Sequence, residues 1–424
     1  MIFESDFAKT EYIEKDNVVL HTWKKEAHFD DYRTPVIASL NLLREHKDSI
    51  FIVDARNGFE DVKEDVEWGF DYLLPELKKT CCGIWGFILP KISDIEGEID
   101  LWTREIEKNF QVIRAESYEE ILIKANGRKV TVAAVQMQCT EKVGDNLKKA
   151  EEMIRKAAAD GAEMILLPEL FEREYFCQQR RYDFYEYAMR TEDNPAVKMG
   201  MRLAAELKVV LPISFYEKDG NVLYNSVACI DADGTLLGVY RKTHIPDDHF
   251  YQEKFYFTPG NTGFKVFETK YGRLGIGICW DQWFPETARS LALMGAELIF
   301  YPTAIGSEPI LGCDSMPHWR RCMQGHSAAN LVPVVAANRI GVEKVEPCRE
   351  NAGQSSALVF FGSSFMTDGT GEIVASASRD REEILLYTYR LDMLYSDRLS
   401  WGIFRDRRPE CYGKLTNEQT YGKS

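Results

Sequence analysis

Long apolar runs are missing from this sequence, and basic side chains are in the minority. No run approaches the roughly 18 apolar residues that a membrane-spanning helix needs. The 424 residues include 52 Lys and Arg but 67 Asp and Glu, a formal net charge of −15. This charge argues against nucleic acid and anionic membranes as general partners. The acidic, mixed N-terminus is also unlike a signal or transit peptide. We therefore expect a cytoplasmic protein with no membrane or nucleic-acid partner.

Closely spaced metal-binding residues are absent as well. The ten Cys are scattered without a CxxC pair, and the seven His include no HExxH. Neither a zinc ribbon nor a disulfide framework has support, and the neighbouring Cys81 and Cys82 are typical of thiols rather than a bridge. Gly275-x-Gly277 lacks the third glycine of a dinucleotide fingerprint. We expect no metal and no cofactor.

Composition and charge indicate a folded chain of more than one domain. With 45% hydrophobic and 12% aromatic residues, it is too apolar for a disordered protein. The polar turn signal at 124–129 is followed by a new apolar strand pattern. Residues 1–128 carry 17 basic and 27 acidic side chains, against 35 and 40 in the rest. We place a domain boundary there, giving domains 1–128 and 129–424.

The first domain alternates between strand and helix patterns. Strands are predicted at 17–23, 49–55, 84–89 and 111–115, and helices at 31–46, 61–79, 96–110 and 118–123. This order resembles STAS or SpoIIAA-like modules, which are small regulatory α/β domains. Such modules often carry a phosphorylatable Ser after the central strand, whereas residues 54–58 read Asp-Ala-Arg-Asn-Gly. The resemblance thus implies a small STAS-like α/β domain without a phospho-switch, and its role stays open.

The second domain combines strand–helix units with hairpins. Strand patterns at 130–138, 164–169, 209–215, 272–279, 297–302 and 332–336 are interleaved with helix patterns at 145–160, 195–207, 285–295 and 319–330. Asp/Gly turns predict hairpins near residues 219–221, 231–234 and 368–371. This mixture predicts layered sheets with helices outside.

Three of the apolar strand patterns end on residues that packing does not call for. Glu169, Lys242 and Cys279 each close such a segment. Together they form a nucleophilic set in which the carboxylate takes the thiol proton, the thiolate attacks a carbonyl and the ammonium stabilises the oxyanion. We also expect Lys242 to lower the pKa of Cys279. Taken singly, each residue has a structural explanation: an inert core Cys, a helix-start Glu or an exposed Lys.

The sequence around these residues resembles a known family. PELF, YRKTHIP and GICWDQWFPE, in this order, are similar to the Glu-Lys-Cys motifs of the nitrilase (carbon–nitrogen hydrolase) superfamily. The resemblance covers about residues 129–412, and segments such as HWRRCMQGHSAANLVPVVAANRIG look like those of N-carbamoylputrescine amidases. It implies an αββα sandwich and a homo-oligomer of at least two subunits.

The resemblance also implies roles for individual residues. Glu169 corresponds to the general base, Lys242 to the oxyanion-stabilising cation and Cys279 to the nucleophile. Glu253 matches a second glutamate beside the triad, the Trp280 backbone N–H an oxyanion donor, and Tyr175 a pocket-lining tyrosine. Two segments depart from the family pattern and are expected near the pocket mouth: 248–250 and 351–356.

The resemblance favours a Cys-dependent amidohydrolase that cleaves the ureido group of a small-molecule substrate, N-carbamoylputrescine. Alternatives are a hydrolase of a carbamoyl-amino acid or an ω-amide, and a regulatory protein that uses the second domain as a scaffold. An amine-ended substrate calls for carboxylates such as Glu308 or Asp281. His244 and His326 raise a Cys-His protease or acyltransferase reading, but we expect both to be structural hydrogen-bonding residues, since a Cys-Glu-Lys set needs no imidazole.

Overall fold

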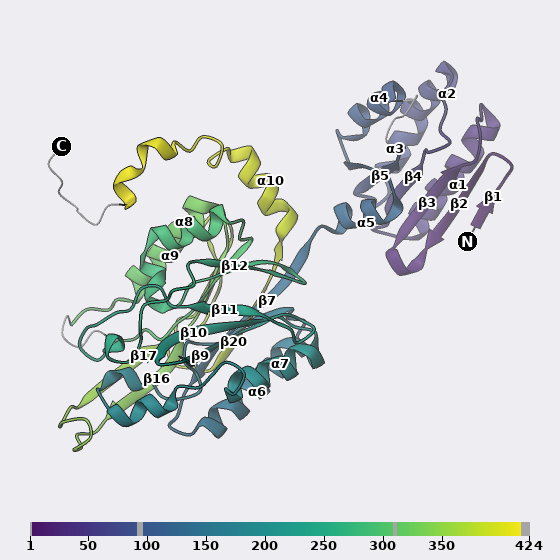
Figure 1. The fold of residues 1–424 in the computed structure, drawn as a ribbon. Helices are drawn as coiled ribbons and strands as arrows, with labels where there is room; N and C mark the ends of the chain where they lie inside the picture. Colours follow the sequence, from purple (N-terminus) through teal and green to yellow (C-terminus); the bar gives the residue numbers. More distant parts are fainter. Residues whose placement is uncertain (1, 91–95, 308–311, 417–424) are drawn as a thin grey trace. The chain divides into compact units, whose positions relative to one another are not determined.

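The computed structural model describes residues 2–90, 96–307 and 312–416. The chain forms two compact units, Met1–Arg128 and Lys129–Ser424 (Figure 1). Among the described residues, every buried hydrophobic cluster draws its members from a single unit. Each unit therefore has its own core.

Unit Met1–Arg128 is built on one six-stranded sheet with the order β1-β2-β3-β4-β5-β6. The first three strands pair antiparallel, and β3 to β6 run parallel. The sequence patterns located the four parallel strands but missed β1 and β2, whose polar residues hide the alternation. The strands are β1 Ile2–Glu4, β2 Ala8–Ile13, β3 Val18–Trp23, β4 Ile50–Asp54, β5 Ile84–Ile88 and β6 Gln111–Ala115.

Helices cover both faces of this sheet. Apolar residues of α1, α3 and α4 pack on one face, and those of α5 on the other. The single helix predicted over 61–79 is interrupted by a π-helical turn, Gly69–Leu73. The Trp102 ring lies so close to Gly69 that a Cβ there would be 2.2 Å from it. The helices are α1 Asp30–Glu45, α2 Lys63–Trp68, α3 Leu74–Leu77, α4 Glu96–Ile106 and α5 Tyr118–Asn126.

Unit Lys129–Ser424 contains two layers of sheet. In the first layer, β7 pairs with both β20 and β8. The Ile165 N–H of β8 donates to Val210 O, just before β9, and so joins these strands to β9, β10 and β11. The second is a six-stranded sheet in the order β12-β13-β14-β15-β18-β19. The first layer comprises β7 Lys129–Gln138, β8 Met164–Leu166, β9 Leu211–Asp219, β10 Val222–Ile230, β11 Leu236–Arg241 and β20 Glu383–Arg390. The second comprises β12 Lys265–Thr269, β13 Gly272–Ile276, β14 Leu298–Pro302, β15 Val334–Ala337, β18 Phe365–Thr367 and β19 Ile373–Ser376.

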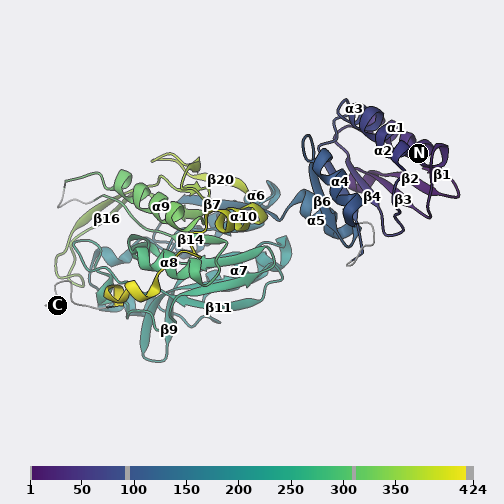
Figure 2. The same ribbon diagram turned by 90° about the horizontal axis from the view of Figure 1, so that it is seen from above.

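Helices lie outside both sheets. Buried residues of α6 Val143–Ala159 and α7 Pro195–Leu207 pack on the first layer, and those of α8 Pro285–Leu293 and α9 Met316–Asn330 on the second. Between the sheets is a core shared by strands of both, including Val132, Tyr240 and Phe300. Figure 2 shows α8 and α9 lying over β14. The predicted αββα sandwich is thus confirmed.

Three further elements complete this unit. The hairpin of β16 Arg339–Val345 and β17 Ser356–Phe361 extends alongside β7, and α10 Leu391–Trp401 follows β20.

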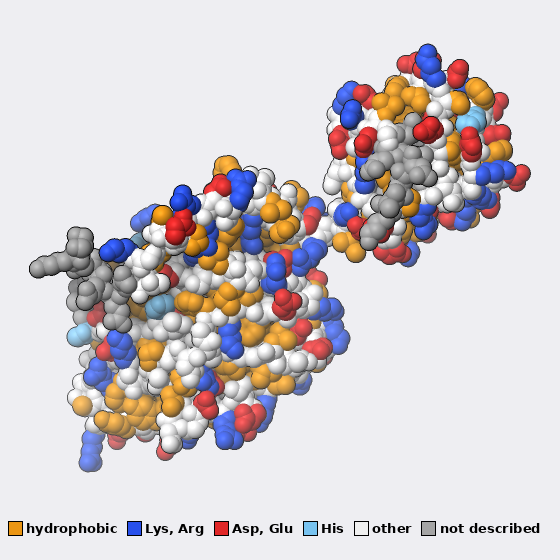
Figure 3. Space-filling model, turned by 45° about the horizontal axis from the view of Figure 1, so that its top comes forward, with side chains coloured by type: hydrophobic (Ala, Val, Ile, Leu, Met, Phe, Trp, Pro, Cys, Tyr) orange, Lys and Arg blue, Asp and Glu red, His pale blue; other side chains and the backbone are white. Residues whose placement is uncertain are grey.

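No helix in the described part of the chain is both long and apolar enough to cross a membrane. Acidic and basic side chains are interspersed on the face drawn in Figure 3.

Candidate active site

The structure places Glu169, Lys242 and Cys279 in loops or short turns that follow strands. Lys242 comes directly after β11, whereas Glu169 lies three residues beyond the end of β8. Cys279 opens a short 3₁₀ helix, Cys279–Trp283, after β13. All three residues are buried. The expectation that these residues stand near strand ends is met, although β8 and β13 are shorter than their apolar patterns suggested.

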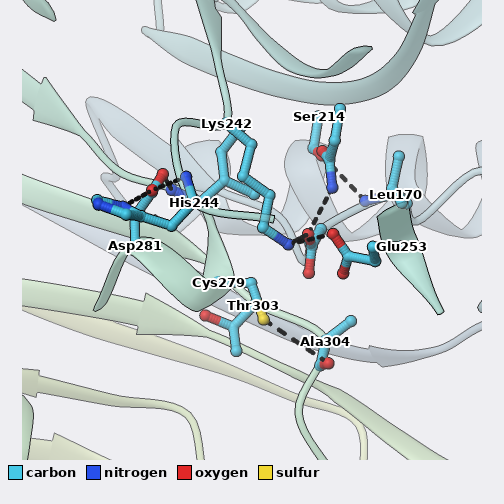
Figure 4. A network of polar contacts seen from close by, with 12 residues as sticks. Leu170, Ser214, Lys242, His244, Glu253, Cys279, Asp281, Thr303 and Ala304 are labelled. Atoms are coloured by element: carbon cyan, nitrogen blue, oxygen red, sulfur yellow. Dashed lines mark hydrogen bonds and ion pairs between the residues drawn. The ribbon is translucent and has the colours of Figure 1, made fainter. Parts of the chain in front are cut away.

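The Lys242 ammonium lies between two carboxylates. Its Nζ donates to Glu169 Oε1 at 2.8 Å and to Glu253 Oε2 at 2.6 Å. Figure 4 shows the head groups of Lys242 and Glu253 beside Cys279. The Tyr175 hydroxyl donates to Glu253 Oε1 at 2.6 Å. Four residues singled out in the sequence therefore belong to one buried hydrogen-bond network, and Cys279 is their neighbour.

The two oxygens of Glu169 differ in their partners. Oε1 accepts hydrogen bonds from Lys242 and from Asn225 Nδ2, the latter at 2.7 Å. Oε2 is buried and has no hydrogen-bond partner in the described part of the structure. Because buried polar atoms are nearly always hydrogen-bonded, Oε2 is an acceptor ready for a group that arrives during the reaction.

Burial dominates the electrostatics of this network. It raises the pKa of Glu253 to about 7, against the opposing effect of Lys242 and with the support of Glu169. Burial alone would lower the pKa of Lys242, but Glu169 and Glu253 outweigh it and the pKa is raised. Lys242 therefore stays protonated, while Glu253 can hold a proton near neutral pH.

Cys279 occupies a strained position. Its φ is 40°, in the left-handed region that residues other than glycine rarely adopt, and its Sγ donates to Ala304 O at 3.8 Å. Burial, and then Glu169, raises the pKa of the Cys279 thiol far more than Lys242 lowers it. The prediction of a Cys with lowered pKa is therefore wrong for the resting site. The thiol is neutral there and needs a base.

A buried ion pair holds the segment that carries Glu169 and Tyr175. Arg339 Nη2 donates to the backbone oxygens of Glu169 and Leu170, at 2.8 and 3.0 Å. Arg339 Nη1 donates to Glu343 Oε1 at 2.8 Å, and Glu343 Oε2 accepts the Tyr175 N–H. Sequence reasoning missed this pair because two charges on a strand pattern usually face solvent. The apolar run VPVVAA, which leads directly into Asn338 and Arg339, was the available signal.

A cavity of about 250 Å³ opens onto Cys279. Trp280, a residue that is 40% exposed, and Glu253 contribute to its wall, whereas Tyr175 is not among the described lining residues. A neighbouring hollow shares Asp247 and Asp248 with it and is also lined by residues of 248–250 and 351–356, the two segments expected at the mouth. The cavity is lined by Pro246, Asp247, Asp248, Tyr251, Glu253, Cys279, Trp280, Trp283, Ala304 and Ile305.

Asp281 has a different place from the one expected for an amine-binding carboxylate. Its Oδ2 accepts from the Tyr240 hydroxyl at 2.7 Å and from the Ile278 N–H at 2.9 Å, and Oδ1 accepts the His244 N–H. Asp281 is fully buried and absent from the described cavity wall. It holds the backbone before Cys279 through the Ile278 N–H, and Figure 4 shows it bonded to His244. The prediction for Asp281 is wrong, since these bonds use its oxygens. Glu308 lies outside the described residues.

The two histidines make structural contacts. The His244 ring stacks on Phe284 and lies 2.7 Å from Asp281 Oδ1. His326 Nε2 lies 2.9 Å from Gln282 O. Within the described ranges, no three His, Cys, Asp or Glu side chains are grouped so that they could hold a metal ion. The side chains gathered at the site supply a thiol, two carboxylates and an ammonium.

The comparisons with known proteins agree with this geometry. The model of the carbon–nitrogen hydrolase family matches residues 131–399. N-carbamoylputrescine amidase from Oryza sativa subsp. japonica is 56% identical over 290 residues, which cover 68% of this chain and 95% of that protein. Citrullinase from Francisella tularensis is 49% identical over 290 residues, 68% of this chain and 99% of that protein.

A solved structure of a carbon–nitrogen hydrolase also matches this chain, at the level of the fold. The crystal structure of the carbon–nitrogen hydrolase from Helicobacter pylori G27 has a TM-score of 0.63 and 35% sequence identity, and the match covers 68% of this chain and 99% of that one. Fold, sequence and the buried Cys-Lys-Glu arrangement agree: the chain belongs to the carbon–nitrogen hydrolase family.

Proposed function

We propose that this chain hydrolyses the ureido group of N-carbamoylputrescine to putrescine, carbon dioxide and ammonia. Cys279 is the nucleophile, Glu169 the general base and Lys242 the cation that stabilises the oxyanion. The observation that carries the proposal is Glu169 Oε2, a buried acceptor without a partner in the described structure, in a network that adjoins a neutral buried thiol.

The first half of the reaction forms a covalent intermediate. Glu169 removes the thiol proton as Cys279 Sγ bonds to the ureido carbon, and the carbonyl oxygen becomes an oxyanion beside Lys242 and the Trp280 N–H. Collapse of this tetrahedral species breaks the bond to the terminal nitrogen. Glu169 returns its proton to that nitrogen, which leaves as ammonia, and the substrate remains bound to sulfur as an S-carbamoyl group.

The second half releases the amine. Glu169 removes a proton from a water molecule, which attacks the S-carbamoyl carbon, and Cys279 leaves as the thiolate and recovers the proton. The carbamic acid formed then splits into carbon dioxide and the amine. Glu253 and Tyr175 position Lys242 throughout, since Glu253 bonds to both.

The charge of the cavity supports an amine-ended substrate. Asp247 and Asp248 line its wall, and none of its described lining residues is Lys or Arg. Arg180 Nη2, from the neighbouring hollow, lies 3.7 Å from Asp247 Oδ1, so Asp248 is the wall carboxylate without an ion pair among the described residues. Putrescine carries a cationic amine at its far end, for which carboxylates are suitable partners. Citrulline and carbamoyl-amino acids carry a carboxylate, which would lack a paired cation on this described wall.

A panel of substrates tests the proposal. Ammonia release is measured with N-carbamoylputrescine, citrulline, 3-ureidopropionate and an ω-amide under identical conditions. We expect kcat/KM to be highest for N-carbamoylputrescine, and Asp248→Asn to reduce that preference by about tenfold, because one charge pair in a partly closed site is lost. Asp380→Asn, on an exposed loop far from the described cavity wall in sequence, is the matched control. A higher kcat/KM for a carboxylate-bearing substrate would contradict the assignment.

The proposal includes a cytoplasmic location and a homo-oligomer of two or more subunits. The ten Cys are free thiols, in keeping with a reducing compartment. Apolar side chains of α10 are exposed and suitable for covering by another subunit: Met393, Tyr395, Leu399 and Trp401. Light scattering of the purified protein tests the second point, and a monomer at micromolar concentration would contradict it.

A further inference from the structure

Unit Met1–Arg128 contains a cavity that the proposed reaction does not use. It has a volume of about 70 Å³ and lies between the sheet and the helices α1 and α4. Among its walls are Trp23 at the end of β3, Ala55 just after β4 and Phe87 near the end of β5. These are the carboxyl ends of parallel strands, the edge where open α/β sheets bind ligands.

Two nitrogens of the lining residues have no partner. His21 and Trp85 are 1% and 5% exposed, and His21 Nε2 and Trp85 Nε1 lack a hydrogen bond within the described structure. The other ring nitrogen of His21 is held 2.9 Å from Thr10 Oγ1 and 3.0 Å from Ser39 Oγ. Buried polar atoms without partners are uncommon in folded proteins, and His21 and Trp85 bring two of them to the wall of one cavity, where a polar ligand group would bond them.

The chemistry of the walls defines the class of ligand. Aromatic rings dominate, and no Lys or Arg is found among the described lining residues. Burial lowers the pKa of His21 to about 3, so its imidazole is neutral. An anion would be buried without a counter-charge, at a high cost in free energy. Flat rings can stack on these walls, and Trp85 requires an acceptor atom on the ligand.

The segments around the cavity have the features of a binding site. Leu73, the last residue of the π-helical turn, lines it, and π-turns are frequent at functional sites. Phe59 comes from the irregular segment after β4, and its ring meets Trp23 edge-on at 5.2 Å. The Asp61 carboxylate, also in the wall, accepts from the Tyr32 hydroxyl at 3.1 Å. These contacts hold the side chains of the cavity wall in place, so a ligand would enter a site that is already formed.

We propose that this cavity binds a neutral, flat, single-ring aromatic molecule that offers both a hydrogen-bond donor and an acceptor, as a phenol does. Its ring packs among the aromatic walls, and its polar group satisfies Trp85 Nε1 and His21 Nε2. The unit that contributes none of the proposed catalytic residues is then a ligand-binding module.

Phenol itself is the probe for the test. Its binding to the full-length protein is followed by ligand-observed NMR and calorimetry, with benzoate as the charged analogue. We expect saturable binding with a dissociation constant of about 1 mM, and binding of benzoate at least about tenfold weaker. No saturation by about 10 mM phenol would overturn the proposal, and equal affinity for benzoate would overturn the assignment to a neutral ligand.

Three variants locate the site. Ala55→Leu fills the cavity and should abolish phenol binding while leaving ammonia release unchanged. Trp85→Phe removes the unpartnered N–H and should weaken binding about fivefold. Trp68→Phe, in the same unit but absent from the described cavity wall, should have no effect. If Ala55→Leu does not fold, the comparison of Trp85→Phe with Trp68→Phe decides. Equal affinity in these two variants would overturn the proposal.

Discussion

Arg339 offers a sharp test of how the active site is held together. Its guanidinium is fully buried and donates to the backbone oxygens of Glu169, Leu170 and Arg173 and to the carboxylate of Glu343. Arg339→Met removes these bonds and leaves Glu343 as a buried charge without its partner. Breaking a buried pair in this way costs about 3–5 kcal/mol of stability. The backbone of Glu169 also loses its anchor, and a displacement of the base by about 1 Å lowers kcat by about 10²-fold.

Two measurements separate these effects. Urea unfolding reports stability, and ammonia release from N-carbamoylputrescine reports kcat and KM. Arg339→Met combined with Glu343→Gln removes the unpaired charge but keeps an acceptor for the Tyr175 N–H, so stability should recover in part while kcat stays low. Arg155→Met, at an ion pair on the surface of α6, should change neither quantity. Recovery of kcat together with stability in the double variant would refute a positioning role for Arg339.

Three further predictions follow from the site and from the division of the chain. Lys242→Ala should lower kcat by at least about 10²–10³-fold, and Lys242→Arg should not restore it because a planar guanidinium cannot replace a compact buried ammonium; near-normal rates for the Arg variant would contradict this. The raised pKa of Glu253, about 7 against an ordinary 4.5, means that the folded chain binds a proton which the unfolded chain has released in this pH range. Stability should therefore fall by up to about 3 kcal/mol as pH rises from 4.5 to 7. Unfolding at pH 5 and 8 should show that Glu253→Gln reduces the slope, while Glu174, whose pKa burial also raises to about 7, keeps part of it; an equal slope in both proteins would refute the prediction. A truncated protein that begins at Gly127 should fold and release ammonia within about threefold of the full-length rate, since the hydrophobic clusters of Lys129–Ser424 are its own; a soluble but inactive product would assign residues 1–128 a part in the active site.

The sequence predicted the layered fold because most of its elements follow simple apolar patterns. Helix α7 was predicted at its observed bounds, and the strand at 130–138 differs from β7 by one residue. Strands β1 and β2 escaped because their inward positions include Thr10, a polar residue that is fully buried. A polar side chain that hydrogen-bonds inside a core looks in sequence like one that faces water.

The candidate site could be predicted only in part, and the missing part has a related reason. Glu169, Lys242, Glu253 and Cys279 could be singled out because local motifs surround each of them. The buried Arg339–Glu343 ion pair and the structural role of Asp281 could not be predicted, since they depend on partners distant in the chain. The pKa of Cys279 was predicted in the wrong direction because Lys242 was weighed alone. Burial and the nearby carboxylates, which exist only in the folded chain, outweigh that ammonium.

The most direct test of the central claim compares ammonia release from N-carbamoylputrescine by the wild-type protein and by Cys279→Ala, with Cys322→Ala as a control thiol outside the described cavity wall. We expect Cys279→Ala to stay folded and its rate of ammonia release to fall by far more than the ~10²–10⁴-fold typical of losing one acid–base group, while Cys322→Ala keeps the wild-type rate. Retention of more than about a tenth of the wild-type rate by Cys279→Ala would contradict covalent catalysis by this thiol, because the loss of a nucleophile cannot be so mild.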